Sequence, residues 1–191
     1  KGMTRLVRDW LANTQLTEST NLVIVGGDLD RPNPAEKQVL DEIQQMIDAN
    51  PAGSGVVLLG ARQPSTVADV LTAATHGAGA GIAARGVYAN GAPKEEFGLA
   101  VLEALAAGLP VVGPAQGGPA TYVDVDVTGV LVTPDEDLGP ALVRALGLHC
   151  IDHRAAAARD MIAERYTIGA YADALLGAYR CAVIGVGASS L

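Results

Sequence analysis

Residues 93–120 read PKEEFGLAVLEALAAGLPVVGPAQGGPA and hold the clearest pattern in the chain. The run 99–107 consists of good helix formers and is flanked by Gly98 and Gly108. A glycine just past a helix and a proline two residues later are typical stop signals. The run that begins at Pro110 and continues through Val111 and Val112 is typical of a buried strand. The stretch therefore predicts a loop, a helix over 99–107 and a strand that follows it.

Two acids bracket the start of this predicted helix. Glu95 lies in the loop before it, and Glu103 lies about one turn inside it. The first turn of a helix carries unpaired N–H groups and the positive end of the helix dipole, so phosphate binds there readily. Glu103 is placed to accept hydrogen bonds from ribose hydroxyls, and Glu95 to face a sugar beyond the phosphates. The alternative is an ordinary βαβ crossover with two solvated glutamates, which the spacing of the pair alone favours.

The whole stretch carries more information than the pair of acids. It resembles the donor-site signature of retaining glycosyltransferases of the GT-B fold, especially glycosyltransferase family 4. That family has two glutamates with seven residues between them, a Phe-Gly after the first, a Glu-Ala, an Ala-x-Gly-x-Pro-Val-Val and a later Gly-Gly. These features stand here as Glu95, Phe97-Gly98, Glu103-Ala104, residues 106–112 and Gly117-Gly118. The Gly-Gly-Pro at 117–119 is similar to that of sucrose-phosphate-synthase-like members.

The resemblance implies a role for each matched residue. Glu103 is expected to hold the ribose and Glu95 the hydroxyls of the donor sugar, while Phe97, Gly98 and Leu99 offer backbone N–H groups to sugar and phosphate. Lys1-Gly2 matches the end of a family loop that contacts the diphosphate. Lys1 and Glu95 are therefore the predicted catalytic residues. For Lys1 the alternative is a disordered chain end, which its position alone favours.

Outside this stretch, helix and strand patterns alternate along the chain. Buried strands are predicted at 22–25, 56–59, 87–89 and 130–132. Helices are predicted over the first residues, after an Asn33 cap, from Ser65 to Leu71, and at 116–123, 135–146, 152–166 and 168–183. The predicted fold class is α/β, with a Rossmann-like parallel sheet flanked by helices as one half of a GT-B fold.

Two loops after predicted strands add donor-binding candidates. Gly26-Gly27 follows the first strand, and Arg62 follows the second. Ligands on open α/β sheets bind at the carboxyl ends of the strands, and the resemblance places the nucleobase near Arg62. A plain turn for the glycines and a surface charge for Arg62 remain open as alternatives.

Composition narrows the function classes. The chain has 191 residues, enough for one domain, and its net charge of −8 argues against nucleic acid as a partner. No signal peptide and no membrane-spanning apolar run is present in the sequence, so a cytoplasmic protein is expected. Cys150 and Cys181 are interpreted as reduced thiols, with a disulfide between them as the alternative. Asp124 and Asp126 fall in a predicted turn, so no metal site is predicted.

The predicted function is transfer of a hexosyl group from a nucleotide sugar, with a UDP-sugar favoured, to a hydroxylated small-molecule acceptor. Retention at the anomeric carbon follows from the resemblance alone, and no cofactor is expected besides the donor substrate. Heavy use of Ala, Gly and Arg hints at secondary-metabolite, aminoglycoside-like biosynthesis. The alternative is a non-catalytic nucleotide-binding module that requires a partner chain. A nicotinamide-dependent enzyme is disfavoured, because no Gly-x-Gly-x-x-Gly follows any predicted strand.

The resemblance extends from Lys1 to about Tyr179. Residues 1–191 are therefore predicted to form one nucleotide-sugar (donor) binding domain that lacks its first strand and an arginine of the family. The N-terminal acceptor domain of the family is not in the sequence. We expect the chain alone to be an inactive fragment that needs that acceptor domain as its partner.

Overall fold

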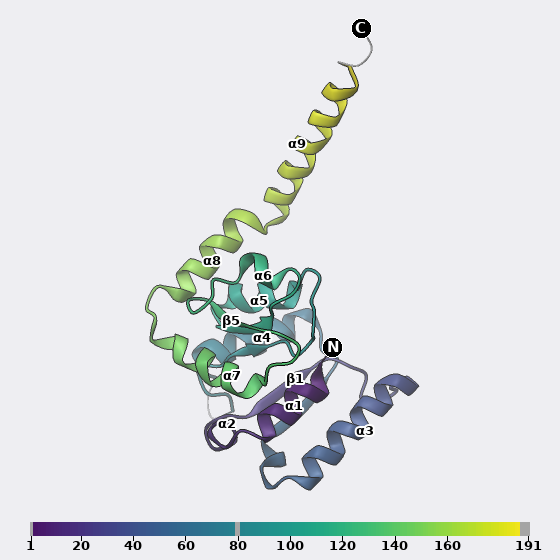
Figure 1. The fold of residues 1–191 in the computed structure, drawn as a ribbon, viewed down its shortest axis with the longest axis vertical. Coiled ribbons are helices and arrows are strands. Elements are labelled where there is room, and N and C mark those ends of the chain that lie inside the picture. Colours follow the sequence, from purple (N-terminus) through teal and green to yellow (C-terminus); the bar gives the residue numbers. More distant parts are fainter. Residues whose placement is uncertain (1, 79–80, 188–191) are drawn as a thin grey trace.

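The computed structural model describes residues 2–78 and 81–187, in which helices alternate with short strands (Figure 1). The strands are β1 (Leu22–Val25), β2 (Val56–Gly60), β3 (Tyr88–Ala89), β4 (Val111–Pro114) and β5 (Gly129–Val132). The α-helices are α1 (Met3–Leu11), α2 (Thr14–Ser19), α3 (Pro34–Ala49), α4 (Pro64–His76), α5 (Leu99–Ala107), α6 (Pro119–Tyr122), α7 (Leu138–Gly147), α8 (Arg154–Arg165) and α9 (Ile168–Gly187). Two 3₁₀ helices, η1 (Pro51–Gly55) and η2 (Leu148–Cys150), complete the described elements.

All strand pairs are parallel, as predicted, but they form two sheets rather than one. β1 pairs with β2, with Leu22 opposite Val56. The second sheet has the order β3-β4-β5, with Tyr88 opposite Val111 and Val111 opposite Gly129. Within the described ranges, β1 does not pair with β3, so the strands form two separate sheets. The expected α/β class with a Rossmann-like arrangement is thus confirmed.

Local signals predicted several elements correctly. Helix α5 spans the predicted range 99–107, with left-handed backbone at Gly98 (φ 83°) and Gly108 (φ 89°) on either side. Asn33 forms a full capping box with Glu36 at the start of α3. Three predictions were wrong or incomplete. The helix expected over 116–123 is limited to Pro119–Tyr122, because Gln116, Gly117 and Gly118 pair with the segment around Glu95. α4 begins at Pro64 after Gln63, not at a Ser65 cap, because proline is favoured in the first turn, and it continues to His76. The short helix α2 was not predicted.

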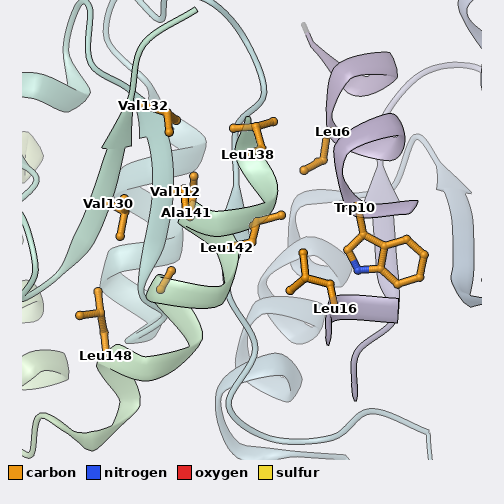
Figure 2. Close-up of a cluster of buried hydrophobic side chains, with 11 residues drawn as sticks. Leu6, Trp10, Leu16, Val112, Val130, Val132, Leu138, Ala141, Leu142 and Leu148 are labelled. Atoms are coloured by element: carbon orange, nitrogen blue, oxygen red, sulfur yellow. The ribbon is translucent and has the colours of Figure 1, made fainter. Parts of the chain in front are cut away.

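The largest buried cluster joins the first two helices to the three-stranded sheet. Figure 2 shows Leu6, Trp10 and Leu16 facing Leu138 and Leu142 of α7. The Trp10 indole also donates a hydrogen bond to the Thr20 hydroxyl at 3.0 Å. The complete cluster consists of Leu6, Trp10, Leu16, Val112, Val130, Val132, Leu138, Ala141, Leu142, Ala145 and Leu148. Helix α7 therefore lies between α1 and the sheet.

A second cluster fixes helix α5 against its sheet. Leu105, Leu109 and Val111 are almost fully buried there together with Ala158 of α8. Because α8 packs directly along α5, the helix that opens at Gly98 is held on two sides, by β4 and by α8. Helix α9 follows α8 and extends away from the rest of the structure (Figure 1).

Several smaller expectations are also settled. Cys150 and Cys181 are both free thiols, so the disulfide alternative is wrong. The segment after α6 makes the predicted turn, in which the Val127 and Thr128 N–H groups donate to the Asp124 carbonyl. None of the helices in the described ranges is both long enough and apolar enough to span a bilayer.

Candidate functional site

Glu95 lies in a loop that is tied to its neighbours on both sides. Its carboxylate accepts a hydrogen bond from the Asn90 amide at 3.1 Å, just after β3. Its backbone N–H donates to Gln116 O at 3.2 Å, and its carbonyl accepts from Gly118 N at 2.9 Å. The Glu95 side chain is therefore presented from a segment whose backbone is fixed by the loop after β4.

The two glycines after β4 permit this pairing. A Cβ on Gly117 would lie 1.9 Å from Glu95 O, and one on Gly118 would lie 2.3 Å from Phe97 O. Gly117 also has φ 96°, in the left-handed region that other residues rarely adopt. The Gly-Gly pair was identified in the sequence through the family resemblance, and the structure shows why glycine is required at both positions. It lets the two loops at this edge of the sheet approach backbone to backbone.

The start of α5 is open. Val101 N and Leu102 N donate to the Gly98 carbonyl, so the helical bonds begin with these two residues. No side chain caps the helix, and no acid lies in its first turn. The N–H groups of Leu99 and Ala100 therefore stand at the positive end of the helix dipole, which is an arrangement suited to an anion.

Tyr122 of α6 holds the entry to this helix. Its hydroxyl donates to Phe97 O at 2.8 Å and lies 3.3 Å from Gly98 O. A Cβ on Gly98 would come within 2.5 Å of that hydroxyl, so only glycine fits there. Burial raises the pKa of Tyr122, and the charge of Glu95 raises it further. The Tyr122 hydroxyl is therefore neutral at ordinary pH and can donate to the loop.

An aromatic pair extends this contact to the end of α8. The Tyr166 ring packs edge-on against Tyr122, with 5.7 Å between centroids, and tilts toward Phe97 at 6.2 Å. Phe97 itself is 51% exposed, and Leu99 beside it is also exposed. These two apolar side chains thus border the open helix end without being part of the core.

Glu103 and Glu95 act on a common neighbour. Burial raises the pKa of Tyr88 on β3 to about 12, and the charges of Glu95 and then Glu103 add to this rise. Both carboxylates are therefore within electrostatic range of one phenol. Glu103 is exposed, on the solvent side of α5. The structure thus places Glu95, Phe97, Gly98 and Leu99 at the start of α5, with Glu103 about one turn further along the same helix.

The other predicted donor residues lie at the end of the two-stranded sheet. Gly26 N donates to Gly60 O at 2.9 Å, and Ala61 N donates to Gly27 O at 2.7 Å. Arg62 is exposed, and its guanidinium folds back onto the carbonyl of Ala61 at 3.0 Å. These residues share the carboxyl-terminal edge of β1 and β2. No hydrogen bond or ion pair found in the described ranges joins them to the Glu95 loop.

The predicted catalytic Lys1 lies outside the described residues. The next residue, Gly2, has φ 76° and packs against the backbone of Gly91, where a Cβ would lie 2.1 Å from the Gly91 carbonyl. Gly91 belongs to the loop between β3 and Glu95. The beginning of the described chain therefore meets the same loop that carries Glu95.

A hollow of about 510 Å³ lies away from this site, between one face of α1 and the loop after β5. The polar groups around the hollow form hydrogen bonds with one another. Arg5 donates to the carbonyls of Thr133 and Glu136. The Asp9 carboxylate accepts a hydrogen bond from Leu138 N at 3.1 Å. Asp126 pairs with Arg144 across the β5 turn. In residues 2–78 and 81–187, no group of three or more potential metal ligands comes together.

Sequence reasoning missed the residues that position the site. Residues 90–94 were expected to form a loop that lines the sugar or acceptor pocket, but no contact of Asn90 with Glu95 was foreseen, and Tyr88, Tyr122 and Tyr166 were given no role in the site. An asparagine at the end of a strand and a tyrosine three residues after Gly-Gly-Pro are weak signals. Their partners lie 5, 25 and more residues away in the chain, so only the folded arrangement reveals them.

The fold belongs to the class of Rossmann-like α/β domains found in GT-B glycosyltransferases. A sucrose-phosphate synthase structure from Thermosynechococcus elongatus matches 97% of this chain and 43% of its own, with TM-score 0.72 and 23% identity. The Anabaena protein HepE, solved in complex with UDP, matches 86% of this chain and 44% of its own, with TM-score 0.57 and 22% identity.

Sequence comparison then gives the family. The glycosyl transferases group 1 family matches residues 1–155, and the chain belongs to that family. A sucrose synthase of Acidithiobacillus caldus is 30% identical over 186 residues, and a sucrose-phosphate synthase of Spinacia oleracea is 31% identical over 139. The matches cover 92% and 71% of this chain. The chain spans only 23% of the first relative's length and 12% of the second's.

Proposed function

We propose that this chain is the donor-binding part of a retaining glycosyltransferase of family 4, which moves a hexosyl group from a UDP-sugar to a hydroxyl. The observation that carries the proposal is the placement of Glu95 and Glu103 on either side of the open start of α5, within electrostatic range of the same Tyr88. This arrangement offers one site for an anion and two flanking sites for hydroxyl groups.

Each residue has a defined task in the proposal. The N–H groups at the start of α5 bind the diphosphate and stabilise the charge that develops on it as the sugar–oxygen bond breaks. Glu103 accepts hydrogen bonds from the ribose, and Glu95 from the sugar. Lys1 contacts the diphosphate, an assignment supported by the packing of Gly2 against the loop that precedes Glu95. Gly26, Gly27 and Arg62 contact the nucleoside through the neighbouring sheet.

UDP is the favoured nucleotide. HepE has been solved with UDP, with UDP and glucose, and with UDP-glucose, and its fold resembles that of this chain. Retention and the family 4 assignment rest on the signature from Glu95 to Gly118. Two relatives are named for the synthesis of sucrose or its phosphate, so a sugar hydroxyl is one candidate acceptor. An aminoglycoside-like secondary metabolite is the other.

We propose that the chain is one domain of a longer enzyme whose acceptor domain lies upstream. In a doubly wound sheet with strand order 3-2-1-4-5-6, removal of strand 1 leaves a two-stranded group, 3-2, and a three-stranded group, 4-5-6. The sheets β2-β1 and β3-β4-β5 have this division. Helix α9, which projects from the body with Ile168, Tyr171 and Tyr179 exposed, supplies an apolar surface for the missing domain. A cytoplasmic location stays a prediction.

The second candidate is a nucleotide-binding module that works with a partner chain. The observation that favours it is the apolar surface of α9, on which Tyr171 and Tyr179 are exposed. This candidate binds donor in the same way and transfers sugar only in the complex.

Calorimetric titration of the chain with UDP and with UDP-glucose tests donor binding directly. We expect saturable binding of UDP and of UDP-glucose. The contacts to the sugar of UDP-glucose should require Glu95. GDP and ADP serve as matched nucleotides that separate base recognition from diphosphate binding. If none of the four ligands binds at millimolar concentration, the proposal is wrong for this chain.

A further inference from the structure

Arg154, the first residue of α8, has a buried guanidinium with unused donors. The residue is 5% exposed, and its Nε and Nη1 atoms are fully buried without a hydrogen-bond partner in the described chain. Buried charged groups are normally paired, because removal of a cation from water is costly when nothing replaces the solvent. The guanidinium therefore requires a partner that the chain itself does not supply.

Two further arginines, Arg85 and Arg159, act electrostatically on this region. Burial lowers the pKa of Arg154, and the positive charge of Arg159 lowers it further. Burial likewise lowers the pKa of His149, and the charges of Arg154 and Arg85 act on it in the same direction. No carboxylate of residues 2–78 or 81–187 forms an ion pair with Arg85, Arg154 or Arg159. None of the three arginines is therefore neutralised by an ion pair in the part of the chain that the structure describes.

His149 helps to define this region. Its Nε2 lies 2.9 Å from the carbonyl of Gly86, and since a carbonyl can only accept, the hydrogen is on Nε2. The interaction joins η2 to the segment that leads into β3. Burial keeps the ring neutral rather than adding a fourth charge.

The amino end of α8 adds to the positive potential. No side chain caps this helix, and its first turn has no acid. The helix has 12 residues, so its dipole is well developed. An uncapped helix start next to a buried arginine without a partner is a favourable environment for an oxyanion.

This region lies on the opposite edge of the sheet from the Glu95 site. Gly86 comes just before β3, and Gly108, whose Cβ would lie 2.9 Å from Arg159 Nη1, comes just before β4. Glu95 and Gly117 follow the carboxyl ends of the same two parallel strands. The two regions are therefore separated by the length of the strands, and the arginines are not part of the donor site.

We propose that Arg154, together with Arg85, Arg159 and the start of α8, binds a phosphate group, either as inorganic phosphate or as part of a phosphorylated small molecule. A dianion matches three arginines better than a carboxylate does, and guanidinium groups form forked hydrogen bonds with phosphate oxygens. The proposal does not depend on donor binding at Glu95.

Thermal unfolding in phosphate tests the proposal. In 10 mM sodium phosphate, compared with sodium chloride of the same ionic strength, we expect Tm to rise by about 3–6 °C for a Kd of about 1 mM. Arg154→Met keeps the apolar stem and removes the charge. It should abolish the phosphate-dependent rise, and Tm in chloride should stay the same or increase, because an unpaired buried cation is gone.

Control variants locate the effect. Arg180→Met removes an exposed arginine on α9, and Glu103→Gln alters the donor site, so both should keep the full rise in Tm. Arg154→Lys retains the charge without the fork and should show a smaller rise; it also serves if Arg154→Met does not fold. An equal rise in wild type and both Arg154 variants, or no rise in wild type, would overturn the proposal.

The source of the phosphate group is identified by a second titration. Glycerol 3-phosphate and inorganic phosphate are each titrated calorimetrically against wild type and Arg154→Lys. Tighter binding of the ester, with loss in the variant, assigns the site to a phosphorylated metabolite. Equal binding, again lost in the variant, assigns it to inorganic phosphate. Binding that the variant leaves unchanged contradicts the assignment to Arg154.

Discussion

The two sheets of this molecule differ in how completely they are covered. Every residue of β4 is buried, and Val111 and Val112 have 0% exposure beneath α5 and α7. In the two-stranded sheet, Val23 is 43% exposed and Val57 is 42% exposed. The residues that cluster around Glu95 lie on the covered sheet, whereas Gly26, Gly27 and Arg62 lie on the exposed one. The proposed donor residues are thus divided between a covered sheet and an exposed one.

The largest expected effect concerns turnover. If the exposed sheet and α9 pack against an acceptor domain in the active enzyme, the chain alone should not transfer sugar. Without that domain, donor and acceptor cannot be aligned in a closed cleft. The chain is incubated with labelled UDP-sugars and a panel of hydroxylated acceptors, and UDP release is measured. Acceptor-dependent release well above the rate without chain would mean that the covered half holds a complete active site.

Val→Ala substitutions in the two sheets test whether the difference in burial is also a difference in stability. Val112→Ala removes two methyl groups from a position with 0% exposure and should lower the free energy of unfolding by about 2–3 kcal/mol. Val23→Ala makes the same change at a half-exposed position and should cost less than about 1 kcal/mol. Urea unfolding of both variants gives the two values. Similar losses would show that the two sheets are equally well packed.

Glu103 tests the covered half as a nucleotide site. Glu103→Gln keeps the size and removes the charge, so UDP binding should weaken by about 1.5–3 kcal/mol, the range for hydrogen bonds to a charged group. Glu42→Gln on α3 is the matched control, since Glu42 is exposed on a helix that packs elsewhere. Calorimetry that finds the same UDP affinity in both variants would remove Glu103 from the ribose site.

Glu95 is expected to affect the sugar more than the nucleotide. Glu95→Ala should weaken binding of UDP-glucose by about 1–2 kcal/mol and binding of UDP by much less, because the lost bonds are to sugar hydroxyls. The adjacent Glu96 forms an exposed ion pair with Lys94 and offers the control Glu96→Ala. Equal losses for the two ligands would place Glu95 outside the sugar site.

The smallest expected effect concerns the Tyr122 hydroxyl, which contacts the loop before α5. Tyr122→Phe removes only the hydroxyl that donates to Phe97 O, so stability should fall by about 1 kcal/mol and UDP affinity by a few fold. Tyr166→Phe keeps the aromatic pair with Tyr122 and is the matched control. A loss of stability without any loss of UDP affinity would mean that Tyr122 supports the fold but does not position the start of α5.

Much of the fold was predictable because its signals are local. Gly98, Gly108 and Pro110 mark the ends of α5 through their own backbone preferences, and the capping box of Asn33 with Glu36 marks the start of α3. Parallel strands were predictable from short apolar runs between helices. The predicted start of α4 was wrong because two adjacent signals, Pro64 and Ser65, competed at one helix end. Helix α2 was missed because its six residues are too few to show a hydrophobic period.

The sequence by itself determined most of the elements, the parallel α/β class and the family signature around Glu95 and Glu103. Only the tertiary structure decided which residues hold that signature in place. The contact of Tyr122 with Phe97 spans 25 positions, and the approach of Gly117 to Glu95 spans 22. Arg154 is polar by sequence and buried by packing, since α8 lies against α5. Such contacts depend on how helices and loops meet in space, which no local pattern of residues records.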